Sequence, residues 1–437
     1  MLVGSLYYLL ILEYHVYLDL QKSKRCQIDG FLRMKKAIVI GCHVCGLGVI
    51  RSLGLKGFQI TAMSYDRTDF GHASKYVYER VEIPHPRVEE KDFIDFLIKN
   101  SYKWNGALIF DTNDEIAVSI SKNKTELANY YKVITAEWGI LRKFIEKPET
   151  YSLAEKCNVP YPKTFLPKTL DELYKIKNAI AYPCILKPVI GHEFMSKFNT
   201  KNFIVSNYNE LLLKFELCLK SGYEVMIQEI IPGPDSNIYE CMIYVNSEGY
   251  INTTFFFRKM RQNPPQFGVS RVAISQGRNP QIEDFTERIL KEADFRGIAT
   301  AEFKKDPRDN QFKLLEINVR AFRPNWLATY CGINFPWIIY MDLVEKEQVK
   351  VTDYKKDVYW IELYQDILNS VFRHNRENLG FRDYIKPYLS KNKTFAVLSA
   401  DDFMPFLKQI SILPIKYYSF FKSITSYGRC INVKRLF

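Results

Sequence analysis

The chain has no uninterrupted hydrophobic run at its start. Residues 1–20 are apolar, but Glu13, His15 and Asp19 interrupt them, and neither a positively charged leading region nor a small-residue cleavage site accompanies them. A poorly attached N-terminal extension therefore explains residues 1–33 best, and a weak membrane-surface helix is the alternative. We expect the folded protein to begin near Met34, where the residue pattern changes abruptly.

Paired cysteine motifs are also missing. Cys42 and Cys45 have CxxC spacing, but no second such pair follows, so a zinc site is not expected. The nine cysteines are an odd number, and several lie within apolar runs. This pattern favours buried, reduced thiols in a cytoplasmic protein.

Acidic residues are too few to balance the basic ones. The chain has 61 Lys and Arg against 49 Asp and Glu, a formal net charge of +12. The positive charges are scattered, and no recognisable nucleic-acid motif accompanies them. Nucleotide phosphates or an acidic substrate explain the excess at least as well as DNA, and we expect no nucleic-acid partner. A length of 437 residues predicts roughly two to four structural units.

The first unit lacks a dinucleotide fingerprint although it begins like a βαβ fold. A buried strand at 35–41 leads into a turn with Gly41, Gly46 and Gly48, a helix at 49–55 and a second strand at 58–64. The spacing of the glycines is not GxGxxG. The polar run 111–115 follows a later strand, where it would face a ligand crevice or simply cap a helix.

The second unit carries two notable lysines. Lys147 precedes Pro148 at a predicted helix start, and Lys187 ends a short apolar strand, where its charge is costly unless it meets an anion. The loop behind it, 191–202, has one glycine only. Another apolar strand ends in 228–233, a polar pair before Pro-Gly that would hold a flat heterocycle or form a plain turn.

The segment 301–322 reads as a β-hairpin around the turn residues 306–310. Alternation predicts a core face and a polar face. The core face would hold Ala301, Phe303, Leu315, Ile317 and Val319, and the polar face Glu302, Glu316, Asn318 and Arg320. Pairing about the turn would make Glu302 and Glu316 cross-strand neighbours. Such a face suits Mg²⁺ and a phosphate, and a solvated outer face is the alternative.

Together these motifs, over residues 36–345, resemble the ATP-grasp family of carboxylate–amine (or carboxylate–thiol) ligases. Within the family, the pattern is similar to that of ligases like D-aspartate ligase and of carbamoyl-phosphate-synthase-like proteins. The resemblance implies that Lys147 and Lys187 hold the ATP phosphates, that Gln228, Glu229 and Ile231 hold the adenine, and that Asp235 takes the ribose. It implies that Glu302, Glu316 and Asn318 bind Mg²⁺ (or Mn²⁺) and that Arg320 faces the transferring phosphate. The glycine-poor loop 191–202 departs from the family, so its residues are not carried over.

The implied fold is α/β and α+β, in several parts. A Rossmann-like pre-ATP-grasp domain would cover 34–140, and a two-lobed ATP-grasp domain would cover 141–345, with lobes at about 141–225 and 226–345. A C-terminal extension, 346–437, would follow. The implied activity joins a carboxylate to an amine through an acyl phosphate, releasing ADP and phosphate.

Further basic residues lie between the hinge and the hairpin: Arg258, Lys259, Arg261 and Arg271. We expect one of them to touch the γ-phosphate or the acyl substrate, and strand parity favours Arg258 as a catalytic residue beside Arg320. Two other functions stay open. The glycine-poor loop is compatible with a degenerate, non-catalytic ATP-binding protein. The Gly41–Gly48 turn, with Asp66 at about the right distance for a ribose, would suit a Rossmann-type oxidoreductase.

The C-terminal segment from Phe406 is aromatic and basic. It would lie on a membrane surface as a peripheral contact, or form a packed helix pair, and packing is the simpler expectation. The substrate pair cannot be named because the acid and amine pockets have no portable motif. The sequence leaves a homodimer open.

Overall fold

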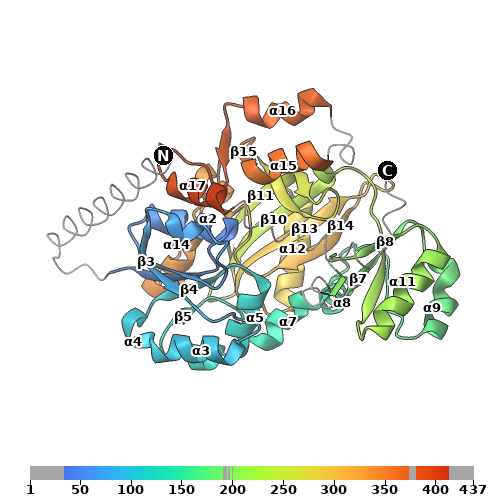
Figure 1. Ribbon diagram of the computed structural model, residues 1–437, viewed down its shortest axis with the longest axis horizontal. Helices are drawn as coiled ribbons and strands as arrows, with labels where there is room; N and C mark the ends of the chain where they lie inside the picture. The colour runs from blue at the N-terminus through green and yellow to red at the C-terminus, as the bar shows by residue number, and fades with distance from the viewer. Residues whose placement is uncertain (1–33, 190–193, 195–196, 199, 374–379, 413–437) are drawn as a thin grey trace, which may run out of the picture. The chain divides into compact units, whose positions relative to one another are not determined.

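The computed structural model describes residues 34–189, 194, 197–198, 200–373 and 380–412 (Figure 1). The predicted extension 1–33, much of the loop 191–202 and the tail beyond 412 lie outside these ranges. The described residues from Lys36 onward belong to one compact unit. In this part of the chain no helix is long and apolar enough to cross a membrane.

A parallel five-stranded sheet opens the fold, in the order β3-β2-β1-β4-β5. Its strands are β1 (Lys36–Ile40), β2 (Gln59–Ser64), β3 (Val77–Glu82), β4 (Leu108–Asp111) and β5 (Lys132–Val133). The helices are α2 (Val44–Gly54), η1 (Gly71–Ala73), α3 (Glu90–Lys99), α4 (Ser101–Trp104), α5 (Asp114–Lys122), α6 (Lys124–Leu127) and α7 (Trp138–Ile145). Strands β1 and β4 are almost wholly buried, as the central strands of a parallel sheet are. The predicted βαβ start is confirmed, with the first helix beginning five residues earlier than expected.

A smaller antiparallel sheet follows, in the order β6-β9-β7-β8, and contains the predicted lysine-bearing strand. Its elements are α8 (Lys147–Lys156), β6 (Thr164–Phe165), α9 (Leu170–Ile176), η2 (Lys177–Ala179), β7 (Cys184–Pro188), β8 (Phe203–Val205), α11 (Tyr208–Lys220) and β9 (Val225–Glu229). The helices α9 and α11 appear in green in Figure 1, beside the sheet strands.

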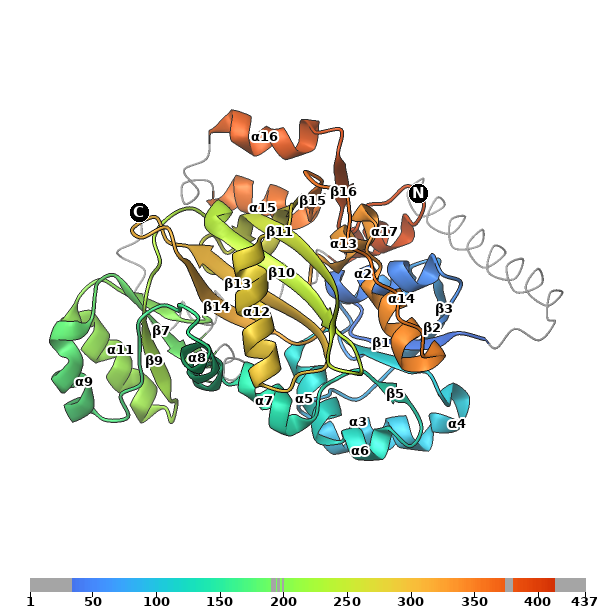
Figure 2. The ribbon, with the colours of Figure 1, turned by 180° about the vertical axis from the view of Figure 1, so that it is seen from behind.

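The largest sheet has seven strands in the order β14-β13-β10-β11-β12-β15-β16. Its first five strands are β10 (Ile238–Val245), β11 (Ile251–Asn263), β12 (Val269–Gln276), β13 (Gly297–Lys305) and β14 (Phe312–Asn318), with η3 (Asp235–Asn237) before them. The helix α12 (Pro280–Glu292) lies across β10 and β13 in Figure 2 and packs its buried face on them.

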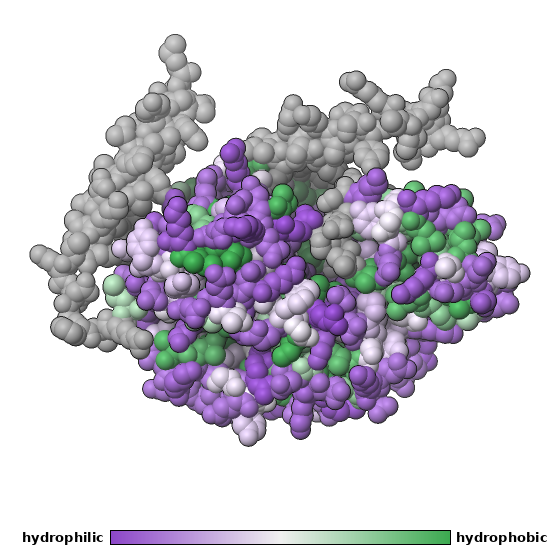
Figure 3. Space-filling view, turned by 90° about the horizontal axis from the view of Figure 1, so that it is seen from below, coloured by the Kyte–Doolittle hydropathy of each residue, from purple (hydrophilic) through white to green (hydrophobic). Residues whose placement is uncertain are grey.

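The C-terminal extension is built into this sheet rather than appended to it. After α13 (Asn325–Cys331), α14 (Phe335–Tyr340) and the π-helix η4 (Met341–Glu345), it adds β15 (Tyr359–Ile361) beside β12 and β16 (Lys393–Phe395) at the edge of the sheet. Its helices are α15 (Leu363–Arg373), α16 (Phe381–Leu389) and α17 (Met404–Ser411). The face of the molecule in Figure 3 is mostly hydrophilic, with small separate hydrophobic patches.

The predicted hairpin is formed by β13 and β14, and Glu302 pairs directly with Glu316. The predicted core face is wrong at one position. A register shift between Glu302 and Phe303 sets Phe303 opposite Leu314, so Leu314 is buried and Leu315 is only partly covered. A β-bulge adds one residue to one strand and reverses the alternation beyond it.

Protein atoms occupy the space next to the glycines of the turn after β1. A Cβ at Gly46 would lie 2.0 Å from the backbone oxygen of Gly41, and one at Gly48 would lie 1.9 Å from Asn325 Oδ1. The amide of Cys42 donates to Asp69 Oδ2 at 2.7 Å. These contacts account for the glycines without a dinucleotide. The seven described cysteines are free and, apart from Cys157, buried, as the sequence predicted.

The contact at Gly46 predicts a measurable loss of stability. Because the obstructing atom belongs to the backbone, Gly46→Ala should lower the free energy of unfolding by about 1–3 kcal/mol. Gly139→Ala is the control, since nothing lies within 4 Å of the added Cβ and the position is helical. That variant should be neutral or up to about 1 kcal/mol more stable. Urea unfolding of both variants tests the difference, and equal midpoints would contradict it.

The extension is attached to the first unit through a buried ion pair. Arg51 Nε on α2 lies 2.9 Å from Asp402 Oδ2, and both side chains are 1% exposed. The same guanidinium donates to the backbone oxygens of Ala396, Val397 and Asp402. Asp402 also accepts from Ser74 Oγ at 2.8 Å. The segment before α17 is therefore held in one position.

Candidate active site

Three carboxylates lie side by side on the large sheet. Glu302 on β13 pairs with Glu240 on β10 and with Glu316 on β14. Glu240 is fully buried and Glu302 is 6% exposed, so the polar face of the hairpin is not a solvated outer face. Burial and the neighbouring Glu302 hold the pKa of Glu240 well above its usual value. This row needs a cation nearby.

Lys259 on β11 supplies that cation in the structure. Its Nζ lies 2.6 Å from Glu302 Oε2 and 3.7 Å from Glu240 Oε1, and it is 3% exposed. Burial acts to lower the pKa of Lys259, but the two carboxylates outweigh it and raise that pKa above the usual value. Lys259 therefore stays charged.

Two lysines from the smaller sheet and from α8 face the same carboxylates. Burial, with the charge of Lys147 second, lowers the pKa of Lys187 to about 8, while Glu316 and Glu302 oppose the shift. Burial acts to raise the pKa of Glu316, but Lys147 and Lys259, among others, lower it to about 2. The predicted phosphate lysines and metal carboxylates are thus close enough to change one another's proton affinity.

The remaining hairpin residues connect this site to the first unit. Asn318 Nδ2 donates to Glu316 Oε1 at 3.0 Å, and Arg320 Nη2 donates to Asn318 Oδ1 at 3.0 Å. Arg320 Nε lies 2.6 Å from Asp114 Oδ1. The run 111–115 therefore borders the site, and Asn113 also caps α5 by accepting from the amide of Ile116. The predicted helix cap is confirmed, and the role of this edge toward a ligand stays a prediction.

Asp111, at the end of β4, is a buried carboxyl beside this connection. Its backbone oxygen accepts from the amide of Ala321 at 3.3 Å. Burial raises the pKa of Asp111 to about 6, against the opposing charge of Arg320.

The predicted adenine segment adjoins the lysines. Gln228 is 1% exposed, and its side chain accepts from Lys187 Nζ at 2.9 Å and donates to Thr164 Oγ1 at 2.8 Å. Glu229 Oε1 accepts from the amide of Lys163, and Ile231 is buried. Asp235 begins η3, and its carboxylate accepts from Gln262 Nε2 at 2.8 Å and from the amide of Gln266 at 3.2 Å. The nucleotide roles of these residues stay predictions.

The prediction for Arg258 is wrong about its face. Phe257 is the partner of Glu240, so alternate residues from Phe257 share the carboxylate face, and Arg258 points to the other side, over the ring of Tyr239. The next residue, Lys259, points to the carboxylate face instead. Lys259 was among the basic candidates, but the register of β11 against β10, which decides the face, is not visible in the sequence.

Two other basic candidates are used inside the fold. Arg261 Nη2 lies 2.8 Å from Asp366 Oδ2, and Arg271 Nη1 lies 3.1 Å from Asp366 Oδ1. Both arginines are at most 3% exposed. They attach α15 to the sheet.

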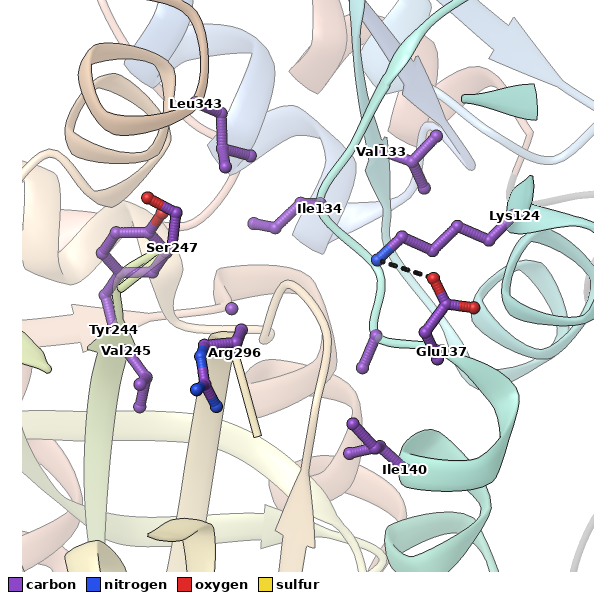
Figure 4. Close-up of a pocket in the computed structure, with 12 residues that line it drawn as sticks. Lys124, Val133, Ile134, Glu137, Ile140, Tyr244, Val245, Ser247, Arg296 and Leu343 are labelled. Atoms are coloured by element: carbon purple, nitrogen blue, oxygen red, sulfur yellow. Dashed lines mark ion pairs between the residues drawn. The ribbon is translucent and has the colours of Figure 1, made fainter. Parts of the chain in front are cut away.

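Two cavities can be placed relative to this site. A cavity of about 450 Å³ borders the start of α8 and the end of β7, next to the lysines in sequence, and includes Pro148 and Val189. Another, of about 260 Å³, is shown in Figure 4, where Ile134, Val245 and Leu343 contribute apolar walls and Lys124 pairs with Glu137 at 3.6 Å. None of the predicted site residues lines the second cavity.

Solved structures share this arrangement of sheets. N5-carboxyaminoimidazole synthetase from Staphylococcus aureus, complexed with ADP, matches with a TM-score of 0.58 and 14% identity, over 79% of this chain and 88% of that one. The L-amino acid ligase from Bacillus licheniformis matches with a TM-score of 0.54 and 16% identity, over 74% and 79%. These likenesses show a shared fold, and it is the multi-part α/β fold that the sequence predicted.

The chain is also similar in sequence to a protein of known activity. The chain is 26% identical over 293 residues to D-aspartate ligase from Enterococcus faecium (strain Aus0004), which covers 64% of this chain and 70% of that protein. No family model matches the chain.

Proposed function

We propose that the protein is an ATP-dependent ligase that joins a carboxylate to an amine through an acyl phosphate, releasing ADP and phosphate. One observation carries the proposal: Glu316, which pairs with the buried Glu302, lies close enough to Lys147 and Lys187 for their charges to lower its pKa. The similarity to D-aspartate ligase and to L-amino acid ligase supports the formation of a carbon–nitrogen bond.

The donor set fits the metal that this chemistry requires. Glu302, Glu316 and Asn318 offer the oxygen ligands that Mg²⁺ or Mn²⁺ prefers. Both carboxylate oxygens of Glu240 are buried without a hydrogen bond, so the row of acids has room for more positive charge than Lys259 provides. Among the described residues no three His, Cys, Asp or Glu side chains already form a metal cluster. We infer that the metal arrives with the nucleotide and neutralises its phosphates.

Each charged side chain around this face would bind a different part of the nucleotide or substrate. Lys147 and Lys187 would hold the phosphates as point charges, and the segment from Gln228 to Ile231 would hold the adenine, with Asp235 near the ribose. Arg320 would offer a donor fork to the transferring group. Its contact with Asp114 sets it beside the edge 111–115, whose negative charge suits an incoming amine.

A phosphate-release screen tests the proposal. The purified protein is incubated with ATP, Mg²⁺ and pools of amino acids, amino sugars and small acids. We expect one pool to stimulate release and to yield a product whose mass equals condensation with loss of water. AMP and pyrophosphate would instead indicate adenylation and contradict the acyl-phosphate route. ATP binding without turnover in any pool would favour a non-catalytic nucleotide-binding protein.

The pKa of Lys187 predicts how ATP affinity depends on pH. Its folded pKa is about 8, below the ordinary value of 10.5, so the ammonium is charged below pH 8 and loses its proton as the pH rises through that value. Affinity for ATP should therefore fall between pH 7 and about pH 9. Calorimetry across this range measures the fall, and Lys187→Arg, which stays charged, should flatten it. An equal slope in that variant would assign the titration to another group.

A further inference from the structure

Lys304 on β13 is a nearly buried lysine that has no counter-ion among the described residues. It is 8% exposed, and no hydrogen bond or ion pair joins its ammonium to the described part of the chain. Burial lowers the pKa of Lys304, and the charges of Asp235, Glu302 and Asp306 act against that shift from beyond contact distance. An enclosed ammonium is costly unless it meets an anion. The fold keeps this charge although nothing in the described chain neutralises it by contact.

The residue opposite Lys304 in the hairpin is another lysine. Strands β13 and β14 pair Lys304 with Lys313 beyond the bulge, so both side chains lie on the face of Glu302. Lys313 is neutralised there, because its Nζ lies 2.7 Å from Asp306 Oδ2 and 3.9 Å from Glu229 Oε1. Like charges directly opposite each other destabilise a sheet. Packing therefore does not explain Lys304, since an apolar side chain at this position would remove both the repulsion and the cost of burial.

Lys304 lies between the two ends of the predicted nucleotide site. Glu302, two residues earlier on β13, belongs to the predicted metal end. At the predicted ribose end, Asp235 accepts from Gln262 Nε2 at 2.8 Å, and Gln262 Oε1 accepts from Lys259 Nζ at 3.5 Å. Lys259 in turn contacts Glu302. These contacts connect the two ends across the sheet face, and the charges of both ends reach Lys304.

We propose that Lys304 binds the phosphate group next to the ribose of the adenine nucleotide, as a third lysine beside Lys147 and Lys187. This proposal rests on the nucleotide site of the proposed function. Between the ribose and the phosphates that a metal holds, this phosphate is the one anionic group of the nucleotide, and an ammonium offers it a compact charge with three donors. ATP, ADP and AMP all carry it, and adenosine does not. Lys304 would therefore hold substrate and product alike.

Calorimetry of the full-length protein with ATP, ADP, AMP and adenosine, each with Mg²⁺, tests the proposal. The weaker ligands are measured by displacement of ADP. Lys304→Met, which keeps the length of the side chain and removes its charge, should raise the dissociation constants of ATP, ADP and AMP by a common factor of about ten or more, and leave that of adenosine unchanged. A loss for ATP alone would assign Lys304 to the last phosphate, and an equal loss for adenosine would assign it to the base or sugar. Either result would overturn the proposal.

Stability and a neighbouring lysine separate this role from a structural one. Without nucleotide, Lys304→Met should unfold in urea at the wild-type midpoint or above it, because the variant removes an enclosed charge. A lower midpoint would show that Lys304 supports the fold, and would overturn the proposal. Lys305→Met is the control, since Lys305 points to the opposite face, where its Nζ lies 5.9 Å from the centre of the Phe312 ring. That variant should bind all four ligands like the wild type.

The same titrations distinguish a failure of this proposal from a failure of the proposed function. If the wild type and Lys304→Met bound the nucleotides equally, only the role of Lys304 would be overturned. If the wild type bound none of the nucleotides, the nucleotide site would be wrong and both proposals would fail. The expected losses, combined with no ligation in the substrate screen, would support the role of Lys304 and contradict the ligase reaction.

Discussion

Glu316→Ala should abolish turnover while leaving the protein folded. Glu316 pairs with Glu302 at the centre of the site, and Lys147 and Lys259 hold its carboxylate charged. Loss of one metal-ligating carboxylate removes charge where the phosphates and the reacting group meet, so we expect kcat to fall about 100-fold or more. The side chain of Glu316 is only partly buried, and β14 is an edge strand of the sheet. Its contribution to packing is therefore small.

The control lies in the same hairpin. Asp309 is in its turn, away from the carboxylate row, and Asp309→Ala should keep normal turnover. Phosphate release with Mg²⁺, ATP and the substrates found by the screen measures both variants, and circular dichroism checks their folding. Normal Mg²⁺-dependent activity in Glu316→Ala would show that the metal face is assigned to the wrong residues.

Lys187→Met should weaken ATP binding strongly. The side chain of Lys187 is partly buried, its ammonium donates to Gln228 Oε1, and the charges of Glu316 and Glu302 reach it. A hydrogen bond to a charged group contributes about 1.5–3 kcal/mol, so the dissociation constant should rise roughly ten- to hundredfold. Methionine keeps the length of the side chain and removes only the charge and its donors. Calorimetry with ATP and Mg²⁺ measures the change.

Lys201→Ala provides the comparison for this variant. Lys201 is exposed, just before β8, and its charge is screened by water. Its effect on ATP affinity should be several times smaller than that of Lys187→Met. If the wild type and Lys187→Met bound ATP equally, the phosphate site would have to lie elsewhere.

The hairpin was the most predictable part of the site. Turn residues between two alternating segments fix both the pairing and its centre, which is why Glu302 and Glu316 were found opposite each other. The bulge at Leu315 was not predictable, because one extra residue leaves the composition and most of the alternation unchanged. The mistaken choice of Arg258 rather than Lys259 has a similar cause, because the face of a β11 residue depends on the register of β11 with β10.

The C-terminal region was the least predictable part of the fold. Strands β15 and β16 have three residues each, too short for a pattern to show in the sequence. Asp402 and Glu362 look like ordinary surface acids in the sequence, and their buried partners Arg51 and Gln409 are 351 and 47 residues away. Contacts over such separations are set by tertiary packing, and a local pattern cannot reveal them.

The pairing of Arg51 with Asp402 bears on how the chain matures during synthesis. Translation delivers Arg51 early, and 351 further residues must follow before its carboxylate partner exists. The backbone oxygens of Ala396 and Val397, which also enclose the guanidinium, come equally late, so until then Arg51 meets water on the surface of α2. The extension therefore removes Arg51 from water in the same step that supplies its carboxylate, and this burial belongs to the end of synthesis.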